Sequence, residues 1–377
     1  MKKIQMLDLA SQYHKIKEEV DSAMINVVES TAFIKGPEVK KFQEELESYL
    51  KVKHVVPCAN GTDALQMALM ALGLKPGDEV ITANFTFAAT VEVIHLLGMK
   101  SVLVDVNEDD FTIDIKELEN AITSKTKAII PVHLFGQCSD MEAIMQIAEA
   151  NNLYVIEDTA QAIGSDYKFK DGTTKKAGTI GDIGTTSFFP SKNLGCFGDG
   201  GALMTNNDEL AKRLSAISNH GMFKRYYHDE VGVNSRLDSI QAAVLRIKLR
   251  KLDEYNCSRR DAARYYSTKL QEIEGITPPK INNFSTHVFH QYTLKLDKII
   301  DRDALRKYLA DNDVPSMIYY PLPLHKQKAY LNVNVSDNDF PVTMNLIDSV
   351  ISLPMCTELT SKQQDYIIIK IKEFIYK

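Results

Sequence analysis

Residues 185–201 read TTSFFPSKNLGCFGDGG, in which a short β-type run leads into a lysine and a glycine-rich loop. Pro190 ends the run, because proline cannot donate a hydrogen bond to a sheet ladder, and Lys192 follows at once. The glycines after it allow the backbone to turn tightly and to approach a ligand closely. A lysine in a partly apolar pocket loses its proton more easily than a solvated one, and a neutral amine is a nucleophile. The pattern predicts either a catalytic lysine at position 192 or, more plainly, a surface lysine in a turn.

A second informative stretch, LYVIED at residues 153–158, has the pattern of a buried strand that ends in two carboxylates. Ligands of open α/β sheets bind at the carboxyl ends of the strands, so Asp158 is expected to project into such a site. Pyridoxal phosphate needs an acid beside its pyridine nitrogen and a lysine for its aldehyde. Asp158 and Lys192 are these two residue types in the usual order, although an Asp after a strand is also a common helix N-cap.

A third stretch, NGTDAL at residues 60–65, follows a strand-like run and opens a helical pattern. A helix N-terminus presents free amides and the positive end of the helix dipole, and it therefore binds phosphate. The alternative is that Thr62 or Asp63 simply caps the helix. The three stretches together indicate a pyridoxal phosphate site far more specifically than any one of them.

With these motifs the sequence resembles the DegT/DnrJ/EryC1/StrS family of nucleotide-sugar aminotransferases. The similar stretches run from residue 7 to residue 324, nearly the whole chain. The run SFFPSKNLGCFGDGGA and the stretch HGMFKRYYHDEVGVNSRLDSIQAA at residues 220–243 most resemble the branch that aminates 3-keto sugars. Within that branch the match is closest to the UDP-2-acetamido-2-deoxy-3-keto-glucuronate aminotransferases.

The resemblance implies the aspartate-aminotransferase fold (fold type I of the pyridoxal phosphate enzymes) and a cytoplasmic homodimer. It also implies the activity: an amino group passes from glutamate to a keto sugar on a nucleotide, for surface polysaccharide biosynthesis. A UDP-linked 2-acetamido-3-keto uronate is the expected acceptor, with a dTDP-linked 3-keto-6-deoxyhexose as the alternative.

Roles for single residues follow from the same resemblance. Lys192 would hold the cofactor's aldehyde and move the proton between the substrate carbon and the cofactor, and Asp158 would pair with the pyridine nitrogen. Gln161 matches the residue that bonds the phenolic oxygen, and Phe87 matches the aromatic that stacks on the ring, although Phe87 is equally a core residue by its sequence context. The positions that match phosphate contacts are Gly61, Thr62 and Ser187.

Other matching positions concern the second subunit and the substrate. Asn234 matches a residue that reaches the phosphate from the partner, and Arg236 matches a substrate-facing position of the same loop. An ion pair at the start of a helix is the plainer role for Arg236. The family often reads His-Tyr-Pro where this chain has Tyr319-Tyr320-Pro321 at the substrate side. Tyrosine carries no positive charge near neutral pH, which weakens the expectation of a sugar carboxylate.

Two other functions are possible on the same motifs. A dehydratase or lyase would use the same cofactor, but that branch of the family has histidine in place of the lysine, and Lys192 argues against it. A regulator or scaffold that keeps the fold without catalysis needs none of the cofactor residues, and the complete set argues against it.

The alternation of strand and helix patterns predicts a mainly parallel sheet covered by helices on both faces. The resemblance implies seven strands, one of them antiparallel. The candidate strands are 54–58, 79–83, 100–106, 127–133, 153–157, 183–189 and 200–205, and the candidate helices are 15–30, 37–50, 62–72, 87–97, 114–122 and 140–150. We expect a large cofactor-binding domain at residues 1–235 and a smaller α+β domain at residues 236–377. The second would contain helices at 236–255, 257–273, 302–311 and 361–376, with strands at 288–296 and 315–320.

Composition excludes several other classes of protein. The 377 residues carry a formal charge of -6, which argues against a general nucleic-acid binder. The five cysteines form no C-x-x-C pair, which is typical of reduced thiols in the cytoplasm. We expect no signal peptide and no membrane span. We also expect no metal site, since His287 and His290 have no accompanying cluster of ligands.

Overall fold

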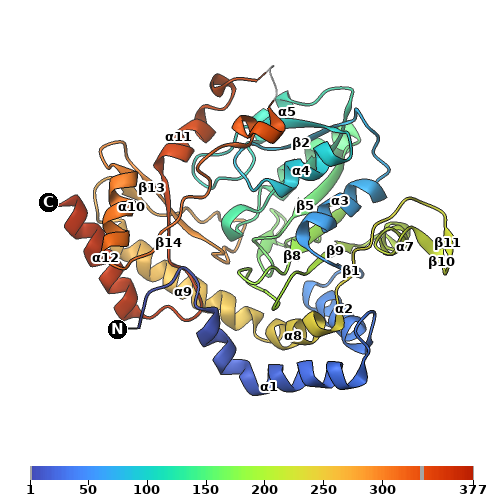
Figure 1. Ribbon diagram of the computed structural model, residues 1–377. Coiled ribbons are helices and arrows are strands. Elements are labelled where there is room, and N and C mark those ends of the chain that lie inside the picture. The colour runs from blue at the N-terminus through green and yellow to red at the C-terminus, as the bar shows by residue number, and fades with distance from the viewer. Residues whose placement is uncertain (1, 332–334, 377) are drawn as a thin grey trace.

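The computed structural model describes residues 2–331 and 335–376, and a seven-stranded sheet forms its centre (Figure 1). In spatial order the strands are β1 (His54–Cys58), β9 (Gly201–Thr205), β8 (Ile183–Ser187), β5 (Tyr154–Asp158), β4 (Thr126–Ile130), β2 (Glu79–Ala83) and β3 (Lys100–Val104). Strand β9 runs antiparallel to both of its neighbours, and the other pairs are parallel. The predicted sheet, with its one antiparallel strand, is confirmed.

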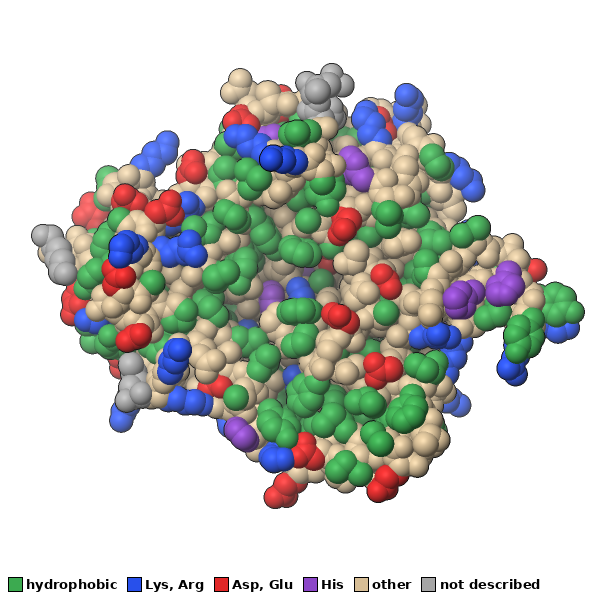
Figure 2. Space-filling model, viewed as in Figure 1, with side chains coloured by type: hydrophobic (Ala, Val, Ile, Leu, Met, Phe, Trp, Pro, Cys, Tyr) green, Lys and Arg blue, Asp and Glu red, His purple; other side chains and the backbone are tan. Residues whose placement is uncertain are grey.

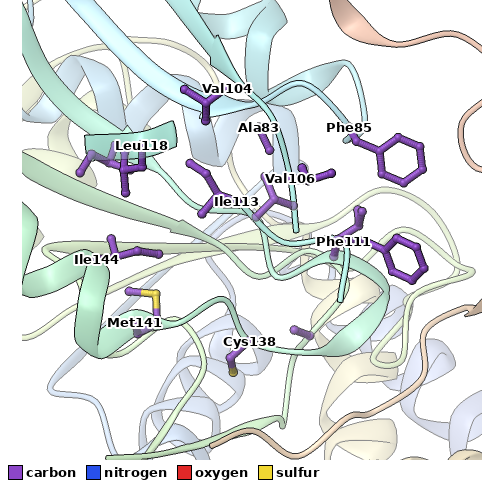
Figure 3. Close-up of a cluster of buried hydrophobic side chains, with 14 of the residues drawn as sticks. Ala83, Phe85, Val104, Val106, Phe111, Ile113, Leu118, Cys138, Met141 and Ile144 are labelled. Carbon is purple, nitrogen blue, oxygen red and sulfur yellow. The ribbon is translucent and has the colours of Figure 1, made fainter. Parts of the chain in front are cut away.

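Helices cover both faces of this sheet, because its strands are apolar on both sides. In β4, Ile129 packs into one core while Ala128 and Ile130 pack into another, as the alternation of a strand requires. The first core contains Leu118 of α5 (Ile115–Asn120) and Ile144 of α6 (Met141–Asn151) (Figure 3). The second core contains residues of α3 (Gly61–Ala71), α4 (Ala89–Leu96) and α7 (Asp208–Ile217).

Helices α1 (Leu9–Ser30) and α2 (Pro37–Leu50) pack against α8 (Ser239–Leu249) beside the sheet (Figure 1). Helix α9 (Leu252–Leu270) then leads into the C-terminal part. The single long helix predicted at 236–255 is wrong: Asp238 caps α8, and Lys251 leaves the helical conformation with φ -108 and ψ 1. The break lets α8 pack on α1 and α2 while α9 packs on α12. The predicted start of the next helix, at 257, lies inside α9.

The C-terminal part contains an antiparallel sheet of β12 (Ile276–Thr277), β13 (Tyr292–Leu296) and β14 (Val350–Leu353). It also contains α10 (Arg302–Asp311), α11 (Pro341–Ser349) and α12 (Ser361–Ile375). The strand predicted at 315–320 is wrong. Only Met317 forms a bridge, with Ser352, and the chain then turns toward the large sheet, where Asn84 Oδ1 accepts a hydrogen bond from the His325 amide at 3.0 Å.

Short elements complete the chain. They are the hairpins β6 (Asp166–Lys168) with β7 (Thr174–Lys176) and β10 (Met222–Lys224) with β11 (Tyr227–His228), and the 3-10 helices η1 (Leu134–Gly136), η2 (Leu324–Lys326), η3 (Lys328–Tyr330) and η4 (Asp337–Asp339). The β10–β11 hairpin projects from the body of the molecule (Figure 1). Within residues 2–331 and 335–376, no helix has the length and apolarity needed to cross a membrane.

Candidate active site

The predicted site lies where β5 and β8 end, beside the N-terminus of α3. Figure 2 shows a hollow near the middle of one face, with a basic and a histidine side chain visible on its floor. Strands β5 and β8 are neighbours, with Asp158 paired to Thr185. Carboxyl ends of parallel strands thus carry their side chains to one edge, which is the usual place for a ligand in such sheets.

Asp158 is an oriented carboxylate at this edge. Its Oδ2 accepts a hydrogen bond from the Thr90 hydroxyl at 2.9 Å, and its Oδ1 accepts one from the Ala160 amide at 3.1 Å. Its backbone is fixed too, since its carbonyl accepts from the His133 amide at 3.0 Å and its amide donates to the Pro131 carbonyl at 2.9 Å. The residue is 6% exposed. A buried carboxylate held in this way can accept a hydrogen bond from a protonated ring nitrogen.

Lys192 lies on the loop after β8, with a partly buried side chain. Burial lowers the pKa of Lys192 from 10.5 to about 8, although the charge of Asp158 acts in the opposite direction. The loop is anchored by the next residue, whose side-chain amide Asn193 Nδ2 donates to Asn256 Oδ1 at 2.7 Å and to the Val288 carbonyl at 3.0 Å. A fixed amine with this pKa is neutral often enough near neutral pH to act as a nucleophile.

The N-terminus of α3 forms a cradle for an anion. Asn60 caps the helix by accepting from the Asp63 amide at 2.8 Å, and the amides of Gly61 and Thr62 belong to the first turn, which has no intrahelical acceptors. A Cβ at position 61 would lie 2.7 Å from the Cβ of Ser187, so glycine is needed for this close approach of α3 to β8. Two amides and a nearby hydroxyl suit a phosphate group.

Aromatic rings line another side of the site. Gln161 Oε1 accepts from the Phe135 amide at 2.7 Å, and Gln161 Nε2 donates to the Tyr320 hydroxyl at 3.2 Å. The Tyr320 ring centroid lies 6.3 Å from that of Phe87 and 6.0 Å from that of Phe85. Phe85 is a core residue, whereas Phe87 is 58% exposed. Phe87 therefore offers a free aromatic face, and the plainer alternative of a core phenylalanine does not hold for it.

The two tyrosines of the C-terminal part reach the site as neutral phenols. Burial raises the pKa of Tyr320 well above its usual value and also raises the pKa of Tyr319. Their ring centroids are 6.0 Å apart. Tyr319 can therefore donate a hydrogen bond to a substrate but supplies no positive charge.

Among the described residues, Asn234 and Arg236 form no hydrogen bond with the other predicted site residues, although Ser235 between them accepts from the Ala59 amide at 3.1 Å. Asn234 is exposed and forms a bridge with Asn219, whose Oδ1 accepts from Arg236 Nη1 at 3.3 Å. Arg236 lines a separate cavity of about 810 Å³ together with Lys35. Burial lowers the pKa of Lys35, and the charge of Arg236 lowers it further. In the part of the chain that the structure describes, Arg236 forms no salt bridge, so the alternative role as a helix-start ion pair is not observed.

A buried network on the opposite face of β5 was not found from the sequence. Glu157 is fully buried, and its carboxylate accepts from His133 Nε2 at 3.0 Å and from the amides of Gly178, Ile180 and Gly181 at 2.9, 2.6 and 2.7 Å. Burial alone would raise the pKa of Glu157, but these hydrogen bonds outweigh it and hold the pKa below its usual value. The adjacent Glu-Asp pair was the available signal, because neighbouring strand residues point to opposite faces.

No cluster of metal ligands accompanies these residues. Among the residues that the structure describes, no group of at least three His, Cys, Asp or Glu side chains could hold a metal ion. The donor set of the site consists of a carboxylate, an amine, amides, hydroxyls and aromatic faces. That set suits a planar, phosphorylated ring with an aldehyde.

Three well-described proteins are similar to this chain over nearly its whole length. It is 45% identical to a pleiotropic regulatory protein of Geobacillus stearothermophilus over 374 residues, 98% of each chain. It is 44% identical to the UDP-2-acetamido-2-deoxy-3-oxo-D-glucuronate aminotransferase of Pseudomonas aeruginosa, covering 93% of this chain and 95% of that protein. It is 41% identical to the UDP-N-acetyl-3-dehydro-alpha-D-glucosamine 3-aminotransferase of Acidithiobacillus ferrooxidans, covering 96% of this chain and 95% of that protein.

Solved structures agree with these relatives. A DegT/DnrJ/EryC1/StrS aminotransferase from Brucella abortus is 40% identical and superimposes with a TM-score of 0.94 over 99% of this chain and 100% of that one. NtdA from Bacillus subtilis, solved with bound cofactor PMP, is 32% identical with a TM-score of 0.91, over 100% of this chain and 86% of that one. The fold is therefore that of the fold type I aminotransferases. The family model matches residues 14–372, and the chain belongs to the DegT/DnrJ/EryC1/StrS aminotransferase family.

Proposed function

We propose that this protein is a pyridoxal 5'-phosphate-dependent aminotransferase that transfers an amino group from glutamate to the keto sugar of a nucleotide sugar. The observation that carries the proposal is that Lys192 and the oriented carboxylate of Asp158 lie at the same sheet edge. Burial lowers the pKa of Lys192 to about 8. Pyridoxal phosphate, when bound, supplies the electron sink that makes a carbon–hydrogen bond next to nitrogen acidic.

The residues fit this cofactor. Lys192 would hold its aldehyde carbon, and Asp158 would accept a hydrogen bond from its protonated ring nitrogen. Gln161 would bond its phenolic oxygen in place of the Tyr320 hydroxyl, to which it now donates. Phe87 would cover one face of the ring. Gly61, Thr62 and Ser187 would bind the phosphate at the start of α3.

The protein's own contribution to the reaction is orientation and proton transfer. The Lys192 amine, on the anchored loop, would move the proton between the substrate carbon and the aldehyde carbon of the cofactor. Asp158 keeps the ring nitrogen protonated because its carboxylate is already held in place by Thr90 and the Ala160 amide. The exposed ring of Phe87 and the buried ring of Tyr320 limit the access of water to the reacting atoms.

A catalytic function is favoured over a purely regulatory one. The Geobacillus relative is named as a regulatory protein, but a regulator has no need for a lysine of lowered pKa, an oriented acid and a phosphate cradle at one edge. Lys192 also argues against a dehydratase with the same fold.

The proposed acceptor is a UDP-linked 2-acetamido-3-keto sugar, with a uronate preferred. The Pseudomonas relative acts, by its name, on a 3-oxo-glucuronate, and the Acidithiobacillus relative on a 3-dehydro-glucosamine. Arg236 would bind the uronate carboxylate in a bidentate pair. The product would enter surface polysaccharide biosynthesis. A dTDP-linked 3-keto-6-deoxyhexose is the second candidate, since Tyr319 adds no charge and relatives at 37–39% identity are named as transaminases of dTDP-linked amino sugars.

We further propose a homodimer in which Asn234 and Arg236 complete the partner's site. Within the described part of one chain neither residue forms a hydrogen bond with the other site residues, and Arg236 lines a different cavity, which supports this arrangement. We also place the enzyme in the cytoplasm, because all five cysteines are free thiols and four of them are buried.

A substrate panel tests the proposed function. The purified protein, loaded with pyridoxal 5'-phosphate and glutamate, is assayed with the UDP-linked 3-keto uronate, its uncharged counterpart and the dTDP-linked 3-keto-6-deoxyhexose. We expect the uronate to have the highest kcat/KM, by roughly ten- to a hundredfold, and Arg236→Ala to remove that preference. A neutral sugar that is preferred, or a preference that survives Arg236→Ala, would reject the carboxylate assignment. One equivalent of 2-oxoglutarate per subunit is expected without any sugar, because glutamate alone completes the first half of the transfer. If none of the three sugars is aminated after that release, the sugar acceptor is rejected.

A further inference from the structure

The segment at residues 286–291 joins the two loops on which the site is built. The Val288 amide donates to the Gly136 carbonyl at 2.8 Å, and the Gln291 amide donates to the Phe135 carbonyl at 3.3 Å. On its other side, the Val288 carbonyl accepts from the side chain of Asn193, the neighbour of Lys192. The segment therefore sits between the loop that holds Gln161 and the loop that carries the lysine.

His290, in this segment, has a buried ring nitrogen without a partner. The residue is 7% exposed, and its Nδ1 has no hydrogen-bond partner among the described residues. The side-chain amide nitrogen of Gln291 lies 3.5 Å from His290 Nε2. An amide nitrogen can only donate, so this contact favours the tautomer in which Nε2 is the acceptor and Nδ1 carries the ring proton. A buried N–H without an acceptor is rare and costly, and it marks a place where an acceptor is expected.

The imidazole of His290 remains neutral in this position. Burial holds the pKa of His290 well below 6.5, and the charges of Lys192 and Arg259 act in the same direction. Arg259 reaches the segment from α9, where its Nη1 donates to the carbonyls of Phe289 and His290 at 3.0 and 3.4 Å. Asp158 faces Lys192 from β5 and is the other charged group near the pair.

Lys192 can supply the missing acceptor, because its chain neighbour Asn193 is bonded to the Val288 carbonyl of the segment that contains His290. The charge of Lys192 lowers the pKa of His290, and within residues 2–331 and 335–376 the structure shows no hydrogen bond from Lys192 Nζ. The neutral amine has one lone pair and can accept one hydrogen bond. The two groups are thus complementary: a fixed, neutral donor and an amine that has lost its proton.

We propose that His290 is a positioning residue for Lys192, whose neutral amino group accepts a hydrogen bond from His290 Nδ1–H during the part of the reaction in which that amine is free of the cofactor. The bond fixes the direction of the amine and favours its neutral form, ready to take a proton. This inference rests on the proposed role of Lys192 in catalysis.

Two substitutions of His290 separate this role from simple packing. The side-chain nitrogen of asparagine lies near the position of Nδ1, and that of glutamine near the position of Nε2. His290→Asn should keep kcat within about threefold of the wild type, whereas His290→Gln should lower kcat roughly tenfold with little change in KM. Packing alone predicts the opposite order, because glutamine is closer to histidine in size. Equal values, or a better His290→Gln, would overturn the proposal.

A second readout does not need the loaded enzyme. The cofactor-free protein is labelled with acetic anhydride over a range of pH, and the acetylation of Lys192 is measured by mass spectrometry. Loss of the donor in His290→Gln should move the midpoint of labelling upward by roughly half to one pH unit, while His290→Asn should leave it near the wild-type midpoint. An unchanged midpoint in His290→Gln would overturn the proposal.

His287 is the matched control. It lies in the same segment and is buried, and its Nδ1 already accepts from the Phe289 amide at 3.0 Å. His287→Asn should lower Tm without moving the labelling midpoint of Lys192. A comparable shift in this control would assign the effect to general loosening of the segment and overturn the proposal.

A measurement on the native histidine covers the case in which the His290 variants do not fold. In protein labelled with nitrogen-15 histidine, the Nδ1–H signal of His290 should move when Lys192 is replaced in Lys192→Ala. An unmoved signal would reject the contact. The proposed function has its own test, independent of His290: it is rejected if the Lys192→Ala protein still catalyses multiple turnovers.

Discussion

At the scale of single residues, the ionisation of Lys192 can be measured directly. Burial disfavours the charged form and lowers the pKa from 10.5 to about 8, so the neutral amine is present at lower pH than in a solvated lysine. The rate at which the cofactor-free protein captures pyridoxal 5'-phosphate should therefore rise with pH and level off above about 8. Stopped-flow absorbance measures this rate. A rise that continues to the ordinary pKa of lysine would contradict the lowered value.

Asp158 carries the second prediction at this scale. Asp158→Asn keeps the size of the side chain and the contact with Thr90 but removes the negative charge. We expect the far-ultraviolet circular dichroism to be unchanged and kcat to fall by orders of magnitude, because the ring nitrogen loses its proton and the electron sink weakens. Activity close to that of the wild type would show that another acid protonates the ring.

Sequence patterns predicted Lys192 and Asp158 as site residues because Asp158 ends one apolar strand and Lys192 lies on the loop after another. They could not identify Thr90 or the amide of Phe135, which hold Asp158 and Gln161 through contacts between segments far apart in the chain. The same limit applies to His290, whose unpartnered nitrogen is visible only once the segment is packed.

At the scale of elements, the start of α3 is the proposed binding site of the cofactor phosphate. A Cβ at residue 61 would come within 2.7 Å of the Ser187 Cβ, so Gly61→Ala should push α3 away from the end of β8. We expect the Kd for pyridoxal 5'-phosphate to rise roughly tenfold while binding of pyridoxal, which lacks the phosphate, changes little. An equal loss for both ligands would mean that the cradle does not bind the phosphate.

Strands and helices of the central sheet were predictable because apolar runs of about five residues alternate with helical patterns. Helix α2 begins at Pro37 and ends at Leu50, as predicted, since proline favours the first turn. The break between α8 and α9 was not predictable, because the sequence remains helical in pattern and only the change of packing partner ends α8. Residues 315–320 have strand-like composition, but only Met317 forms a bridge, with Ser352, and the chain beyond them is held to Asn84 through the His325 amide.

At the scale of the whole molecule, the site residues come from both ends of the chain. Tyr320 belongs to the C-terminal part and bonds Gln161 of the large sheet. We propose that the division into two domains lies near residue 235, where the chain enters α8. Asn234 and Arg236 lie at this junction and are the residues proposed to serve the partner subunit.

Mixed dimers test the shared site. Lys192→Ala is expected to be inactive and Arg236→Ala to be roughly ten- to a hundredfold less active with the uronate, but a mixed dimer has one site with both residues intact. After subunit exchange, an equal mixture should recover up to about a quarter of the wild-type activity. Absence of recovery, with exchange shown by native mass spectrometry of differently tagged chains, would place each complete site within one subunit.

The central claim is that Lys192 holds the aldehyde of pyridoxal 5'-phosphate. The most direct measurement is borohydride reduction of the loaded protein, followed by digestion and mass spectrometry. The expected result is a phosphopyridoxyl group on the peptide that contains Lys192, and none after Lys192→Ala or after glutamate is added before reduction. A label on another lysine, or no label on a protein that has taken up the cofactor, would contradict the claim.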